Sequence, residues 1–223
     1  MNKREVHVII LLVEGDTEVE FYSKVRELLL KKYQDTNKFK FLRPINIKGI
    51  GNYKVNAARQ FDFAVQKFVK ENKPEKNHKL KKSEQKENRI QFIFHAFMCI
   101  DTDVLDSAQK PARFRKNPPI NENDTQKTIR DKNGIPHFIK AIHSIEDWFL
   151  EDSDGIIKYL KVDKIPKFKN NPSGAEKLAI IFKQGNKIYT KGGKSEGFID
   201  NLNVEQILNN HTNDFKELLN LIK

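Results

Sequence analysis

The sequence predicts an α/β fold, in which a mainly parallel, Rossmann-like sheet is flanked by helices and followed by a helical C-terminal portion. Residues 6–13 and 90–100 are nearly continuous apolar runs. Such runs are typical of strands buried on both faces, as in parallel sheets. Apolar residues at helical spacing follow the first run, and alternating strands and helices favour parallel pairing with right-handed crossovers.

The first half of the chain predicts strands and helices in alternation. After the first strand, Val19, Tyr22 and Val25 begin an apolar helix face. A turn-rich segment over 48–52 then separates the second strand from the second helix. The expected elements are a strand over 6–13, a helix over 17–32, a strand over 39–47 and a helix over 53–70.

The second half begins with a charged insertion and ends in helices. Basic side chains outnumber acidic ones over 70–89, and this segment cannot bury a core of its own. Ser144 is a good N-cap, with Asp147 at the position of a capping-box acid. We expect a core over 1–152 and a helical extension over 153–223 packed on the same domain. The other expected elements are strands over 90–100 and 137–143, and helices near 124–132, from 144, and over 156–160, 174–182 and 204–223.

Composition limits the kinds of protein that this chain can be. A net charge of +11 over 223 residues favours a polyanionic partner, chiefly nucleic acid, although an AT-rich genome also yields lysine-rich proteins. The single Cys99 excludes an intrachain disulfide and a multi-cysteine metal site. No run approaches the roughly 18 apolar residues of a membrane helix. We therefore expect a cytoplasmic protein that does not engage a membrane.

Carboxylates follow two of the predicted strands. Glu14 comes directly after the first, and Asp101 and Asp103 come after the strand over 90–100. Ligands of open parallel sheets bind outside the carboxyl ends of the strands. Converging carboxylates repel one another unless a cation neutralises them, and hard oxygen ligands suit Mg²⁺ or Mn²⁺. The sequence therefore predicts a site for one of these ions.

This combination of acids resembles the Toprim domain, which carries a Glu after its first strand and an Asp-x-Asp pair after a later one. Glu14 matches the first acid, and Asp101 and Asp103 match the pair. The stretch Glu-Gly-Asp-Thr-Glu over 14–18 is similar to the E-G-x-T-E form of nucleases of the overcoming-lysogenization-defect family and of small stand-alone bacterial Toprim proteins of defence loci. In that form Glu18 also serves the metal site.

The resemblance implies a Toprim-like fold and a Mg²⁺- or Mn²⁺-dependent nuclease that hydrolyses phosphodiester bonds, in bacterial defence against phage or foreign DNA. It also implies that Glu146, in the acid-aromatic stretch 144–150, is an additional acid at the site. The motifs cover a small part of the chain, and the insertion over 70–89 lengthens the separation between the acids beyond the family's pattern. The basic stretch after residue 106 does not align.

Roles follow from the resemblance. We expect Glu14, Asp101 and Asp103 to bind the ion directly, with Glu18 and Glu146 sharing a second one. Lys191, in a glycine-containing loop, is a candidate catalytic contact to the scissile phosphate, although any single lysine of so basic a chain is more simply a surface residue. The candidate nucleic-acid contacts are Lys79, Lys81, Lys82, Arg113, Arg115 and Lys116.

Other polar residues have simpler explanations. His95 lies within an apolar strand and is expected to be a hydrogen-bonded core histidine, and Trp148 is expected in the core. Asp16 and Asp147 suit the first turns of helices, and His143 is expected to orient neighbours or to be structural.

Two other functions stay open on the sequence. Haloacid-dehalogenase-like phosphatases also place an Asp-x-Asp after a strand, but usually after the first strand, which here ends in Glu14. A non-catalytic subunit could keep the metal pocket and bind nucleic acid or a partner, because stand-alone Toprim proteins can depend on an ATPase. The chain has no P-loop of its own, and its sequence does not choose between DNA and RNA.

Overall fold

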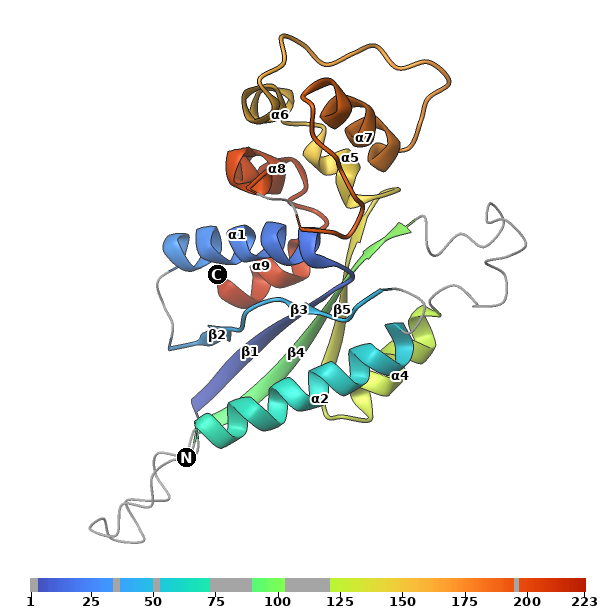
Figure 1. Ribbon diagram of the computed structural model, residues 1–223. Coiled ribbons are helices and arrows are strands. Elements are labelled where there is room, and N and C mark those ends of the chain that lie inside the picture. The colour runs from blue at the N-terminus through green and yellow to red at the C-terminus, as the bar shows by residue number, and fades with distance from the viewer. Residues whose placement is uncertain (1–3, 34–36, 50–52, 73–89, 103–120, 195–196) are drawn as a thin grey trace, which may run out of the picture.

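The computed structural model describes residues 4–33, 37–49, 53–72, 90–102, 121–194 and 197–223. Within them the chain forms a five-stranded, wholly parallel sheet with helices on both faces (Figure 1). Helices also make up the C-terminal portion. The predicted α/β fold class is therefore confirmed.

The central strand, β1 (Arg4–Val13), sets the order of the sheet. β2 (Phe39–Phe41) and β3 (Ile45–Asn46) pair in succession with one edge of β1, and β4 (Ile90–Asp101) pairs with the other edge. β5 (Ile135–Ala141) pairs with β4. The chain thus builds to one side of β1 and then crosses to the other side. This places a topological switch point between the carboxyl ends of β1 and β4.

Strand β1 is buried on both faces because its apolar run is continuous. Its odd-numbered residues from 9 to 13 lie in one hydrophobic cluster, and its even-numbered residues from 8 to 12 lie in another. Helix α1 (Asp16–Lys32) covers the odd face, while α2 (Tyr53–Glu71) and α4 (Glu122–Arg130) cover the even face (Figure 1). Burial of each large aliphatic side chain contributes about 1.5–3 kcal/mol, so this strand anchors both layers.

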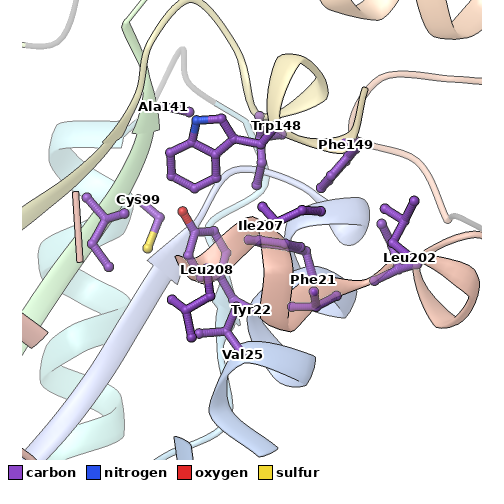
Figure 2. Packing of buried hydrophobic residues seen from close by; sticks show 14 of the residues in the cluster. Phe21, Tyr22, Val25, Cys99, Ala141, Trp148, Phe149, Leu202, Ile207 and Leu208 are labelled. Carbon is purple, nitrogen blue, oxygen red and sulfur yellow. The ribbon is translucent and has the colours of Figure 1, made fainter. Parts of the chain in front are cut away.

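The helices after β5 share the odd-face cluster with α1. They are α5 (Ile145–Phe149), α6 (Ser153–Leu160), α7 (Gly174–Gln184), α8 (Val204–Asn210) and α9 (Lys216–Ile222), with a 3₁₀ turn, η5 (Ile199–Asn201). Figure 2 shows side chains of α1, α5 and α8 meeting in this cluster, among them Phe21, Tyr22, Trp148, Phe149, Ile207 and Leu208. The predicted core position of Trp148 is confirmed, since it is 2% exposed. The division at residue 152 stays a prediction, and one continuous cluster spans it.

Two predicted elements are interrupted. The strand expected over 39–47 is two short strands, because Pro44 lies between them and has no N–H to donate to β1. The single helix expected over 204–223 is wrong, since α8 ends before His211. The ring of His211 lies 2.8 Å from Glu151 and 3.0 Å from Asp214, and these contacts hold the turn between α8 and α9.

The connection from β5 to α5 also differs from its prediction. β5 ends two residues earlier than expected, and His143 follows it in the left-handed region with φ 63. Ser144 is the N-cap of α5, as expected. Its hydroxyl, however, donates to the Asp147 carboxylate at 3.1 Å instead of accepting a backbone N–H. None of the helices within the described ranges is long and apolar enough to cross a membrane.

A row of three histidines crosses the odd face of the sheet. His95 on β4 is 3% exposed. Its Nε2 lies 2.9 Å from Nδ1 of His7 on β1, and its Nδ1 lies 2.9 Å from Nε2 of His137 on β5. The predicted hydrogen-bonded core histidine is therefore confirmed. Burial, together with the two neighbouring histidines, lowers the pKa of His95 to about 4.

This pKa makes stability depend on pH. The unfolded chain protonates His95 below about pH 6.5, whereas the folded chain does so only below about 4. The stability that depends on neutral His95 is therefore fully present above pH 6.5 and is lost as the pH falls toward 4. We expect a loss on the order of 1–3 kcal/mol from this group. The free energy of unfolding in urea, measured from pH 7 to pH 4, should fall less in His95→Gln than in the wild type.

His143→Asn is the control for this experiment, because His143 is an exposed histidine whose left-handed backbone Asn tolerates. It should follow the wild-type pH dependence. Equal slopes for His95→Gln and the wild type would contradict the role given to His95.

Candidate functional site

Five of the predicted site residues come together at the switch point. Glu14 follows β1, Glu18 lies in the first turn of α1, Asp101 is the last residue of β4, and Glu146 lies on α5. Lys191 reaches them from the loop between α7 and η5. The site is therefore built from both halves of the chain, at the sheet edge where open α/β proteins bind ligands.

Lys191 joins two of the acids. Its Nζ lies 2.8 Å from Oδ2 of Asp101 and 3.9 Å from Oε2 of Glu146. These acids are only 4% and 1% exposed. Oδ1 of Asp101 accepts a hydrogen bond from the backbone N–H of Ile145 at 2.8 Å, and Oε1 of Glu146 accepts one from the Tyr189 hydroxyl at 2.8 Å. Such partners are needed because an uncompensated buried charge is strongly destabilising.

Glu14 and Glu18 face the same group of acids. Burial, then the charges of Asp101 and Glu18, raise the pKa of Glu14 to about 8. Burial raises the pKa of Glu18 to about 7, and Asp101 and Glu146 add to the effect. Within the described residues, Oε1 of Glu14 and Oε2 of Glu18 are buried without a hydrogen-bond partner. Each carboxyl group is therefore poised to hold a proton or a cation near neutral pH.

The loop that carries Lys191 is locked to the start of α1. The two residues after Gly15 donate hydrogen bonds to the carbonyls of Gly192 and Gly193. A Cβ atom at Gly15 would lie 2.6 Å from Cα of Gly192, which is closer than two such atoms can approach. The glycine of the Glu-Gly-Asp-Thr-Glu motif is therefore required by backbone contact, and this contact fixes the position of Lys191.

An open hollow of about 470 Å³ borders Glu14 and Glu18. Lys48, between β3 and α2, is an exposed cation on its wall. The sequence predicts a turn at Lys48 but not its place beside the acids, because that place follows from the pairing of β3 with β1 next to Glu14. The hollow is lined by Glu14, Gly15, Asp16, Glu18, Asn46, Lys48, Gly49, Lys191 and Gly192.

The other predicted site residues cannot be placed. Asp103 lies outside the described residues, as do the six predicted nucleic-acid contacts Lys79, Lys81, Lys82, Arg113, Arg115 and Lys116. The sequence motifs assign no role to Tyr189, whose hydroxyl donates a hydrogen bond to Glu146. Its signal is its position two residues before Lys191.

The acids supply the type of oxygen ligand that suits a hard divalent cation. Their arrangement within the described residues, however, is not that of a metal site. Among the described residues, no three His, Cys, Asp or Glu side chains are arranged to hold a metal ion. Lys191 supplies a positive charge among them. The donors are nevertheless carboxylate oxygens, which suit Mg²⁺ or Mn²⁺. The buried oxygens of Glu14 and Glu18 that lack partners within the described residues are the atoms that a cation would satisfy.

Comparisons with models of protein families, with curated proteins and with solved structures found no match. The resemblance to the Toprim domain therefore depends on the sequence motifs alone.

The raised pKa of Glu14 gives a test of this electrostatic environment. The unfolded carboxyl group releases its proton near pH 4.5, and the folded one near 8. Stability therefore falls as the pH rises from about 4.5 to 8, and Glu14→Gln removes this loss. In EDTA at pH 9 we expect the variant to unfold in urea with a free energy about 1–3 kcal/mol above that of the wild type, and with no such gain at pH 4.

Glu27→Gln, which changes an exposed glutamate of α1, the helix that follows Glu14, is the control and should show no such gain. A Glu14→Gln protein that is no more stable than the wild type at pH 9 would show that the carboxyl group is not held in a costly charged form.

The glycine contact gives a second test. Gly15→Ala places a methyl group against Gly192, so we expect the Lys191 loop to shift and the free energy of unfolding to fall by about 1–3 kcal/mol. Gly193→Ala is the milder control, because its Cβ would meet its nearest neighbour, Thr190, at 3.2 Å. Equal stabilities of Gly15→Ala and the wild type in urea would contradict the required contact.

Proposed function

We propose that this protein is a Mg²⁺- or Mn²⁺-dependent nuclease that hydrolyses phosphodiester bonds of nucleic acid. The observation that carries the proposal is the convergence of Glu14, Glu18, Asp101 and Glu146 around Lys191 at the switch point of the sheet. Of these, Glu14, Glu18 and Asp101 are acids that the resemblance to the Toprim domain assigns to the ion by motif, and Glu146 is its additional acid.

The four carboxylates are the residues that would hold the ion. When bound, Mg²⁺ or Mn²⁺ would activate a water and neutralise charge on the phosphate. A carboxylate of this group that does not bind the ion can accept a proton.

The remaining groups orient these acids. The N–H of Ile145 fixes one oxygen of Asp101, and the hydroxyl of Tyr189 fixes one oxygen of Glu146. Among the described residues, the ammonium of Lys191, 2.8 Å from Asp101, is a cation that can contact a phosphate oxygen of the substrate.

The charge of the protein supports nucleic acid as the substrate. The net charge is +11, and Lys48 and Lys191 line the hollow beside the acids. Cations around a carboxylate site draw a polyanion to it. By the same resemblance, we propose that the protein acts in the cytoplasm in defence against phage or foreign DNA, alone or with an ATPase partner.

Cleavage of a mixed panel tests the proposal. Supercoiled plasmid, single-stranded DNA and bulk tRNA are each incubated with Mg²⁺ or Mn²⁺. We expect at least one to be cleaved, and Glu14→Gln and Asp101→Asn to lower the rate by about 100-fold or more. Both changes keep the size of the side chain while removing its charge.

Glu27→Gln, with its exposed side chain, is the matched control and should cleave at the wild-type rate. A wild-type protein that binds Mn²⁺ but cleaves no member of the panel would contradict hydrolysis by this chain alone and would favour a non-catalytic or partner-dependent role. Equal Mn²⁺ affinities of Glu14→Gln and the wild type would contradict the site.

A further inference from the structure

A second hollow, about 620 Å³ in volume, is lined by the same loop that carries Lys191. Its wall combines aromatic rings with cations: Tyr159, Phe182, Lys187, Tyr189 and Lys194. The size suits a ligand of the order of a nucleotide. None of these residues belongs to the acid group itself.

The rings pack on one another: Phe182 is 3% exposed, and Tyr159 and Tyr189 are half-buried beside it. The centroids of Tyr159 and Phe182 lie 5.8 Å apart, and those of Phe182 and Tyr189 lie 5.2 Å apart. Nζ of Lys187 lies 4.2 Å from the centroid of the Tyr159 ring. Lys187 is exposed, and its ammonium covers this face of the Tyr159 ring, so a base can stack there only by taking the place of the ammonium.

The hollow adjoins the acids through one residue. The ring of Tyr189 packs against Phe182 in the hollow, while its hydroxyl donates to Glu146 among the acids. Lys191, two residues later, contacts Asp101. Lys191 and Gly192 line the hollow beside the acids, and Thr190 and Gly193 line this one, so a chain-like ligand whose phosphate lies at Lys191 would pass over this loop to reach it.

The combination of aromatic rings and lysines indicates the chemical class of ligand that the hollow would bind. Lysines bind phosphates of any nucleic acid, but an aromatic ring needs the flat face of a base. In a duplex that face is covered by neighbouring base pairs, whereas an unpaired strand offers it. The rings also pack in the hydrophobic cluster of the odd face, so contact with a base would be a second role for Tyr159.

We propose that this hollow binds a base and its adjacent phosphates from a single-stranded nucleic acid, with the base taking the place of the Lys187 ammonium on Tyr159 and the phosphates at Lys187 and Lys194. The inference rests on the proposed function, because it names the form of nucleic acid that reaches the acids. Binding at the hollow itself requires no metal ion.

Fluorescence anisotropy in EDTA tests binding without cleavage. The full chain is titrated into a labelled single-stranded DNA, the RNA of the same sequence, and the duplex of each. We expect Tyr159→Leu to weaken single-strand binding by about 5- to 100-fold and Tyr159→Phe to leave it unchanged. Lys187→Ala/Lys194→Ala should weaken it and make its salt dependence shallower by about 0.7 per lysine.

The matched control is Lys158→Ala/Lys183→Ala, which removes the same charge from two exposed lysines of α6 and α7. These lysines are not part of the hollow's wall, so single-strand affinity should stay within about twofold of the wild type. Circular dichroism establishes that each variant is folded. If the loss of the Tyr159 ring disturbs packing, the Lys187→Ala/Lys194→Ala variant still tests whether the hollow binds the strand.

Tighter binding of a single strand than of its duplex supports the inference, and a preference for DNA or RNA identifies the sugar. Equal affinity for duplex and single strand, or wild-type affinity in both Tyr159→Leu and the lysine variant, overturns it. If the protein binds single strands as expected but cleaves no substrate, this inference stands and the proposed nuclease function is wrong. If cleavage depends on Glu14 but neither Tyr159→Leu nor the lysine variant weakens single-strand binding, the nuclease proposal stands and this inference is wrong.

Discussion

The ion pair between Lys191 and Asp101 is the interaction on which the rest of the candidate site depends. Four carboxyl groups are buried or half-buried at one edge of a parallel sheet. Their mutual repulsion must be offset if they are to stay close together. The lysine comes from the C-terminal half of the chain, and the strand ends come from the N-terminal half. Charge balance therefore ties the helical portion to the sheet, in addition to the hydrophobic cluster that they share.

The same balance explains why the site is costly to maintain. Burial disfavours the charged forms of Glu14 and Glu18, and each has an oxygen without a partner within the described residues. Arrangements of this kind persist where function requires groups that a stable core would exclude. The loop that carries Lys191 also lines the hollow beside Tyr189. The same loop therefore contacts both the acids and a group of aromatic rings.

The sequence predicted features that depend on local pattern, and it missed those that depend on distant pairing. The apolar runs located β1 and β4, and the acids after them follow from the rule for parallel sheets. Pro44 divides a predicted strand, and the contacts of His211 end a predicted helix, because single side chains outweigh periodicity there. His95 was predicted as a core residue, but its row with His7 and His137 requires the register of three strands. The contact between Gly15 and Gly192 has no local signal at all.

That glycine contact also orders events during synthesis. The hydrogen bond from Thr17 to Gly193 joins residues 176 positions apart, and contacts of such separation form only after the intervening chain has been made and closed. Until then the carboxylates that follow β1 and β4 lack Lys191. A chain that ends before residue 191 therefore contains the four acids but not the lysine that balances their charge.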